Sequence, residues 1–361
     1  MSSAVRPVPD TSLPPTTDWL VRGKDGRLTA YTPARGAVLR WTEDHRGGPH
    51  WSGPDSFPAP DVDPYLAIAQ GPDGYVHLVA LRRRPLPDGR TGTDVVFALQ
   101  YQSGLGFRDW SVVGNPYPND PRHAALMGQP GAVVDADNSL HVFVRNVGGG
   151  VCGRSSVPNG KWNKWADYKG SAGAGAVTGT IDARGLMAFA LPTADAVMHW
   201  GQETKGVKFH RREDLADKAE ADSVSGLATA DDRITWYWHS AADRTVRAWR
   251  PGMDAPAVLG TGTGTGPIAL LRAPVDGHDC TILAHRDAAT GRPALAAYPT
   301  EDESRGVTWT LTGEPCVGVP ALALDGRGRV VLAAFGADGS LRVCRQKDDE
   351  PGLALGPWGR F

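Results

Sequence analysis

Three flat aromatic side chains, Trp200, Trp249 and Tyr298, recur at one equivalent position of successive sequence repeats of about 50 residues. Aromatic rings present broad apolar faces, and small-molecule sites combine such faces with a few well-placed polar groups. The spacing therefore predicts a pocket that holds a sugar or another small ligand against these rings. The alternative is that the rings only pack between neighbouring repeats, which is the commoner use of bulky side chains.

A second equivalent position carries polar side chains, Arg145, His239 and His285, in the third, fifth and sixth repeats. They could supply hydrogen bonds at the rim of the same pocket, or they could only bind nearby turns. The sequence thus predicts one set of ligand-binding residues: Arg145, Trp200, Trp249, Tyr298, His239 and His285.

His239 lies in an unusually aromatic run, Trp236-Tyr237-Trp238-His239. A histidine titrates near neutral pH and suits proton transfer, provided that a carboxylate or a tyrosine lies close to it. If the protein is an enzyme, His239 and His285 are the predicted catalytic residues. The structural alternative is a histidine that ends a strand.

Other chemical motifs are weak or absent. There is no HExxH, GxSxG or Walker A sequence, and the run GTGTGTG (260–266) has no helix pattern after it. We expect that run to be a flexible connector. Asp135, Asp137 and Ser139 alternate like the start of a calcium loop, but the later ligands of that loop are missing, so a β-turn is expected. We predict neither a metal nor a cofactor.

The elements that would position these residues form a repeat. Residues 130–165 are typical of four short strands separated by turn residues. An apolar residue that follows an Asp/Gly-rich turn and opens a strand recurs at steps of 48, 64, 46, 48, 46 and 50 residues. These positions are Leu28, Val76, Leu140, Leu186, Ile234, Cys280 and Val330. The long step contains two insertions, Arg82–Thr93 and Asn115–Gly128.

Each repeat begins with a strand of small apolar residues and continues with a strand that is apolar on both faces. A sheet with two apolar faces must lie between two other sheets. Seven such units predict an all-β, seven-bladed β-propeller of four-stranded antiparallel blades over residues 18–361. Residues 1–17, rich in Pro, Ser and Thr, are predicted to form an extended N-terminal arm.

Charge and composition exclude some partners. The net charge is −2 and the pI is near 6.6, which argues against a nucleic-acid or membrane-surface protein. No apolar run approaches the length of a membrane span, and the first residues lack the apolar core of a secretory signal. The four cysteines form no CxxC pair. A cytoplasmic location is therefore expected.

Two segments, NSLHVFVR (138–145) and GADGSLRVCRQ (336–346), resemble the blade consensus of seven-bladed lectins related to the fucose-binding lectins of Photorhabdus. WNKWADYKG (162–170) resembles the segment that closes each blade in those lectins. The resemblance implies a propeller that binds sugars in clefts between blades, without turnover. Because the repeats of this chain have diverged, one asymmetric site fits better than many equal ones.

Two further functions remain open from the sequence. One is a cytosolic β-propeller enzyme of specialised metabolism with a single modified site at His239 and His285, although the fold alone is a weak argument for it. The other is a protein-interaction scaffold. The blade consensus and the aromatic positions favour the lectin-like function, in which the partner is a sugar or another small molecule.

Overall fold

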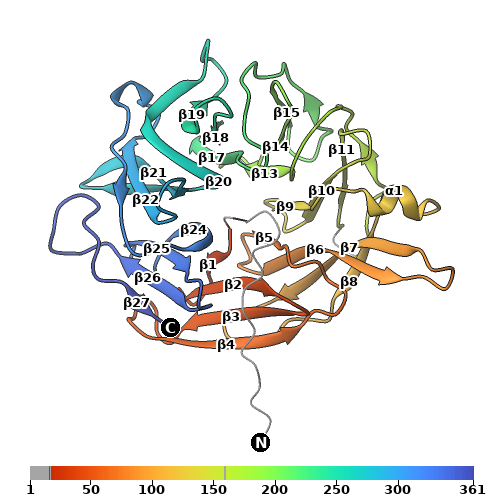
Figure 1. Cartoon of the computed structure of the whole chain (residues 1–361), viewed down its shortest axis with the longest axis horizontal. Coiled ribbons are helices and arrows are strands. Elements are labelled where there is room, and N and C mark those ends of the chain that lie inside the picture. Colours follow the sequence, from red (N-terminus) through yellow and green to blue (C-terminus); the bar gives the residue numbers. More distant parts are fainter. Residues whose placement is uncertain (1–15, 17, 158–159) are drawn as a thin grey trace, which may run out of the picture.

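The computed structural model describes residues 16, 18–157 and 160–361. The predicted arm, residues 1–17, lies outside the described residues except for Thr16. The described chain folds into six antiparallel sheets set radially around a central axis, which is the arrangement of a β-propeller (Figure 1). The prediction of an all-β chain of antiparallel sheets is confirmed, and five of the six sheets have the predicted four strands. No helix among the described residues is long and apolar enough to span a membrane.

Five of the sheets contain four strands that follow one another in the chain. Sheet A contains β1 (Leu20–Arg22), β2 (Leu28–Ala34), β3 (Ala37–Glu43) and β4 (Trp51–Pro58). Sheet B contains β5 (Ala67–Gln70), β6 (Val76–Pro85), β7 (Thr91–Gln100) and β8 (Ser111–Gly114). Sheet C contains β9 (Gly131–Val134), β10 (Leu140–Arg145), β11 (Val151–Ser155) and β12 (Ala166–Asp167). Sheet D contains β13 (Thr178–Ile181), β14 (Met187–Pro192), β15 (Val197–Gly201) and β16 (His210–Arg211).

Sheet E has seven strands, and sheet F, the last, has four. Sheet E contains β17 (Ser225–Ala230), β18 (Arg233–His239), β19 (Thr245–Trp249), β20 (Ala257–Val275), β21 (His278–Asp287), β22 (Pro293–Pro299) and β23 (Thr310–Leu311). Sheet F contains β24 (Val317–Leu324), β25 (Val330–Phe335), β26 (Leu341–Arg345) and β27 (Gly359–Arg360). The second strand of each predicted repeat begins at, or within two residues of, the predicted apolar position.

The flexibility predicted for the connector at residues 260–266 is wrong, because this run lies inside the 19-residue strand β20. Thr263 pairs with Thr245 of β19, and Gly264 pairs with Asp287 of β21. Two of its glycines, Gly262 and Gly264, are required by close packing. A Cβ atom on Gly262 would lie 2.2 Å from the Trp309 ring, and one on Gly264 would lie 2.3 Å from His239 Nε2.

The core lies between the sheets, as the two apolar faces of the second strands predict. At the junction of sheets C and D, for example, the Phe143 and Phe189 ring centroids are 4.5 Å apart. Both rings are almost completely buried. The innermost strands carry small residues and approach closely: a Cβ atom on Gly131 would lie 2.0 Å from the Val177 carbonyl oxygen. Small residues are therefore needed where the sheets converge.

The ring closes by direct packing of sheet A on sheet F. Phe335 of β25 lies 4.6 Å from Trp19 and 5.3 Å from Trp41, measured between ring centroids. The Trp19 indole N–H donates to the Val319 carbonyl at 3.2 Å. Arg345 of sheet F also binds the fully buried Glu43 carboxylate of sheet A at 2.7 Å.

The two insertions in the second repeat lie at the outside of the ring (Figure 1). The first lengthens the hairpin between β6 and β7, whose ladder extends to the pair Pro85 and Thr91. The second contains the helix α1 (Pro121–Ala125), which sequence reasoning missed. Its signal was Asp120-Pro121, since Asp120 accepts hydrogen bonds from the first-turn N–H groups and proline suits the first helical position. A short 3₁₀ turn, η1 (Glu303–Arg305), follows β22.

Candidate functional site

Large aromatic side chains fill the outer parts of most junctions between neighbouring units of the ring. Each stands at or shortly before the fourth strand of a unit and contacts the preceding unit. Phe107 packs on Tyr31 and Phe57, Trp162 on Phe97, and Phe209 on Phe143 and Tyr168. The indoles of Trp309 and Trp358 donate to Leu259 and Thr312, and Trp51 contacts Phe361.

One junction lacks such a residue. Between β19 and β20 the corresponding segment is Pro-Gly-Met-Asp-Ala-Pro (251–256), which contains no aromatic residue. A cleft of about 810 Å³ opens there, between sheet D and the strands β17–β19 of sheet E. Because neighbouring sheets diverge away from the ring axis, a junction without a bulky side chain is left unfilled. The cleft has the size of a small-molecule site.

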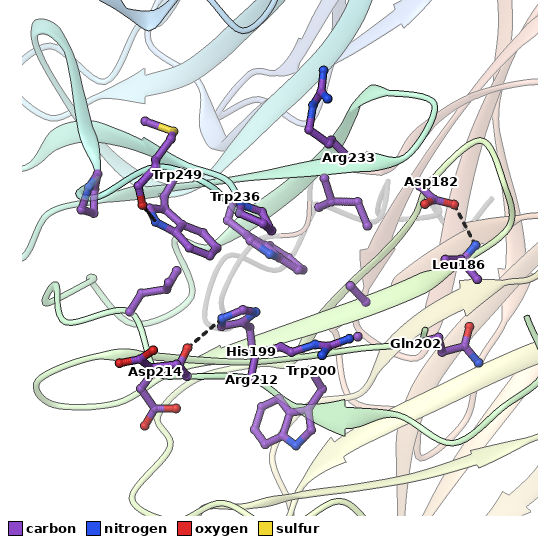
Figure 2. A pocket seen from close by; sticks show the side chains of 18 of the residues that line it. Asp182, Leu186, His199, Trp200, Gln202, Arg212, Asp214, Arg233, Trp236 and Trp249 are labelled. Carbon is purple, nitrogen blue, oxygen red and sulfur yellow. Dashed lines mark hydrogen bonds between the residues drawn. The ribbon is translucent and has the colours of Figure 1, made fainter. Parts of the chain in front are cut away.

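Aromatic rings from both sheets form the inner wall of this cleft (Figure 2). Trp249, the last residue of β19, meets His199 of β15 edge to face, with ring centroids 5.4 Å apart. The Trp249 indole N–H donates to the Met253 carbonyl at 3.2 Å, which fixes the ring. Trp236 is buried behind it. The wall therefore offers a preset aromatic surface that is partly exposed at Trp249.

His199 adds a hydrogen-bond acceptor to this wall. Its Nε2 lies 2.9 Å from the Glu213 carbonyl oxygen, which can only accept, so Nε2 carries the proton. Burial lowers the pKa of His199 below its usual value near 6.5. The ring is neutral at pH 7, and Nδ1 is left as an acceptor.

The rest of the lining is charged. The arginines are each held by a carboxylate: Arg184 by Asp182 at 3.1 Å, Arg212 by Glu203 at 3.1 Å, and Arg233 by Glu301 at 2.6 Å. Asp214 accepts two hydrogen bonds from Arg211, each at 2.7 Å. Glu213 and Asp254 also line the cleft. The site therefore combines an aromatic face with a ring of polar groups, which can orient a hydroxyl-rich ligand.

The two tryptophans predicted as ligand-binding residues differ in their exposure to the cleft. Trp249 is in the aromatic wall, whereas Trp200 is only 1% exposed although it adjoins the same cleft. The Trp200 ring stacks on Phe189 with centroids 4.8 Å apart, and its N–H donates to the Tyr168 carbonyl at 2.9 Å. Figure 2 shows the Trp200 ring directed away from Trp249.

His239 and His285 are brought together, but deep in sheet E. Both are fully buried, and His239 Nε2 lies 3.2 Å from His285 Nδ1. His239 Nδ1 must donate to the Gly266 carbonyl at 2.9 Å, so His285 Nδ1 donates to His239 and His285 Nε2 is left without a partner. Burial lowers the pKa of His239 to about 4 and that of His285 to about 3. A catalytic or ligand-binding role for this neutral pair stays a prediction.

Tyr298 and Arg145 lie elsewhere again. The Tyr298 hydroxyl is 2.7 Å from that of Tyr237 and donates to Glu303 at 3.3 Å, and burial raises the pKa of Tyr298. Arg145, the last residue of β10, donates to the Gly175 carbonyl at 3.4 Å. The six predicted residues therefore do not converge on one pocket.

A second cleft, of about 580 Å³, lies between the second half of sheet E and sheet F. Tyr298 is in its wall, and its other lining residues include Leu295, Leu353 and Leu355. Its lining contains no charged residue among those that the structure describes. This junction carries Trp358 before its fourth strand, unlike the junction of the first cleft, and the two clefts also differ in chemistry.

Sequence reasoning missed His199, Arg212, Glu213, Asp214 and Asp254 as lining residues. The sequence did contain a signal for them. The segment before the fourth strand carries an aromatic residue in each of the other units, but the segment 251–256 has none. The predicted site rested on unusual residues that are present in the repeats. The cleft follows instead from a bulky residue that is absent from this segment.

Comparisons with known proteins identify the fold. No protein-family model matches this chain, and no curated protein matches it in sequence. The BP39L lectin from Burkholderia pseudomallei is similar in structure, with a TM-score of 0.68 and 11% identity over 94% of this chain and 98% of that lectin. SapL1 lectin is similar with a TM-score of 0.51 and 14% identity over 84% of this chain and 98% of that lectin. The Hadza microbial sialidase Hz136 is similar with a TM-score of 0.52 and 13% identity over 75% of this chain. This chain spans only 63% of that sialidase. At these identities the likeness establishes a lectin-like β-propeller fold.

Proposed function

We propose that this β-propeller binds a carbohydrate in the cleft between sheet D and strands β17–β19. The observation that carries the proposal is the open junction itself, where the Trp249 ring is partly exposed beside fixed polar groups. A sugar ring can place its C–H face on Trp249 and exchange hydrogen bonds with the charged lining. His199 and Trp249 are both held by backbone carbonyls, so little ordering is needed on binding.

Two similar structures support a sugar as the ligand class. BP39L is named as a lectin, and SapL1 is a lectin described in complex with α-methyl fucoside. Both have the same fold as this chain over most of their length. The resemblance of residues 138–145 and 336–346 to lectin blades points in the same direction. The choice of a single cleft in this chain rests on its geometry alone.

We further propose that the ring contains seven blades within one domain, residues 18–361. Sheet E then consists of two blades that share the long strand β20. In support, β20 pairs with β19 through its first part and with β21 through its last part. The ladder between β20 and β21 shifts register between Thr265 and Ala269, where the strand passes from one blade to the next.

A glycan array followed by titration of the purified chain tests the sugar-binding proposal. We expect saturable quenching or enhancement of tryptophan fluorescence by at least one monosaccharide or disaccharide. Competition by the free sugar should remove the protein from the array. Absence of any saturable change at millimolar sugar across the array would overturn the proposal.

A further inference from the structure

The free hydrogen-bonding groups in the cleft are acceptors. The carboxylates of Glu213 and Asp254 line it, and neither makes a hydrogen bond or an ion pair with any residue that the structure describes. His199 is only 7% exposed, its Nε2–H is engaged by the Glu213 carbonyl, and Nδ1 remains an acceptor. A ligand that fits these groups must donate hydrogen bonds.

Each arginine in the cleft, by contrast, already has a carboxylate partner. Arg233 binds Glu301 through three contacts of 2.6 to 3.1 Å. Arg184 binds the Asp182 carboxylate through two contacts, and Arg212 binds Glu203. The charge of each guanidinium group is thus largely compensated before a ligand arrives.

The formal charge of the residues that line the cleft is negative, which also suits a ligand that donates hydrogen bonds. Five carboxylates (Asp182, Glu213, Asp214, Asp232 and Asp254) stand against three guanidinium groups (Arg184, Arg212 and Arg233), an excess of two negative charges. Including the ion-pair partners Arg211, Glu203 and Glu301 raises the excess to three. Trp249 adds the negative face of an indole ring, which attracts cations.

We infer that the cleft selects amine-bearing saccharides, whose ammonium group donates to the acceptors Glu213, Asp254 and His199 Nδ1. This inference rests on the sugar-binding function proposed above. An ammonium group has three donors and no acceptor, which matches an acceptor-rich, negatively charged cleft. A sugar carboxylate meets the same excess of negative charge with its arginine partners occupied, so hexuronates bind worst.

The test compares matched sugars that differ in charge. The wild-type chain is titrated at low ionic strength and mildly acidic pH with the hexosamine, hexose and hexuronate of the gluco, galacto and manno series. In at least one series we expect the amine to bind about tenfold more tightly than the hexose, and the hexuronate to bind most weakly. Added salt should reduce the preference for the amine.

Two exposed carboxylates then give the decisive variants. The pair Glu213→Gln and Asp254→Asn should lose the preference for the amine over the hexose, because the new amides carry no negative charge. Glu314→Gln, which removes a carboxylate that lies before β24 and pairs with Arg342 of sheet F at 2.7 Å, is the matched control and should keep the preference. Equal binding of amine and hexose, or tighter binding of the hexuronate, overturns the inference and leaves the sugar-binding function standing. Absence of binding by every sugar overturns both.

Discussion

His199 and Trp249 meet edge to face across the junction of sheets D and E, with ring centroids 5.4 Å apart and planes inclined by 66°. One ring comes from each sheet, and each is fixed by a backbone carbonyl. At the outer edge of this contact the junction is open, and the segment before the fourth strand has no phenylalanine or tryptophan like those at the other described junctions. The pair therefore marks where a packing position of the fold became a surface that a ligand can reach.

Removal of the Trp249 ring should abolish most of the sugar binding. We expect Trp249→Ala to weaken it about thirtyfold, or about 2 kcal/mol, as for central aromatic contacts in other binding sites. Trp110→Ala removes a partly buried indole at the junction of sheets A and B and is the control. Isothermal titration calorimetry measures the sugar affinities of the wild type, Trp249→Ala and Trp110→Ala. Equal affinities of Trp249→Ala and the wild type would contradict a role for this cleft.

Filling the cleft should block binding without loss of the fold. Ala255 is exposed in the segment that lacks an aromatic residue, so Ala255→Trp supplies the missing bulk. We expect sugar binding to fall below detection, while the urea midpoint of unfolding stays the same or rises because apolar area becomes buried. Ala255→Ser is the matched control and should bind like the wild type. A tryptophan variant that still binds sugar would place the site elsewhere.

The buried pair of His239 and His285 should make stability depend on pH. Their folded pKa values, about 4 and about 3, lie below the usual value of 6.5, so only the unfolded chain binds protons between these limits. Stability is therefore fully present above pH 6.5 and is lost as the pH falls toward 4, by up to about 1.4 kcal/mol per pH unit for each histidine.

The variant His285→Phe isolates this contribution. The new ring can keep the stacking on Trp309, which lies 4.0 Å from the His285 ring, but it cannot be protonated. We expect a smaller loss of the free energy of unfolding between pH 6.5 and 4 in the variant than in the wild type, measured by urea titration. Parallel curves for the two proteins would show that the pKa of His285 is not lowered in the folded chain.

Gly264 should tolerate no side chain. A Cβ atom there would lie 2.3 Å from His239 Nε2 and 2.6 Å from His285 Nδ1, and both rings are held in place by hydrogen bonds. We expect Gly264→Ala to cost about 1–3 kcal/mol of stability, as overpacked cores do. Gly106→Ala is the control, since its Cβ would lie 4.0 Å from the nearest atom, on the Phe57 ring. Similar urea midpoints for both variants would refute the packing explanation of the glycine-rich strand.

The junction of sheets A and F, which closes the ring, should contribute as much to the free energy of unfolding as another junction does. Phe335→Ala removes the ring that joins β25 to Trp19 and Trp41, with an expected loss of about 3–5 kcal/mol. Phe209→Ala, at the junction of sheets C and D, has similar burial and should cost about the same. Both variants should unfold in one transition, followed by circular dichroism and tryptophan fluorescence together. A separate early transition in Phe335→Ala alone would show that closure is a weak point of the ring.

Much of this architecture was determined by the sequence alone, because it depends on local patterns. Turn residues before Leu28, Val76, Leu140 and Val330 set the start of the second strand, and its two apolar faces require a sheet on either side. Small residues in the first strand of each repeat fit the crowded axis. These features repeat along the chain, so they can be recognised without knowing which units become neighbours around the ring.

The candidate site was decided by the tertiary structure. Trp200 and Trp249 occupy equivalent positions in the repeat, yet Phe189 and Tyr168 bury the first, while the second faces an unfilled junction. Whether an aromatic ring is core or binding surface depends on the volume supplied by the adjoining sheet. That volume is a property of two units packed together, which the pattern within one repeat does not contain.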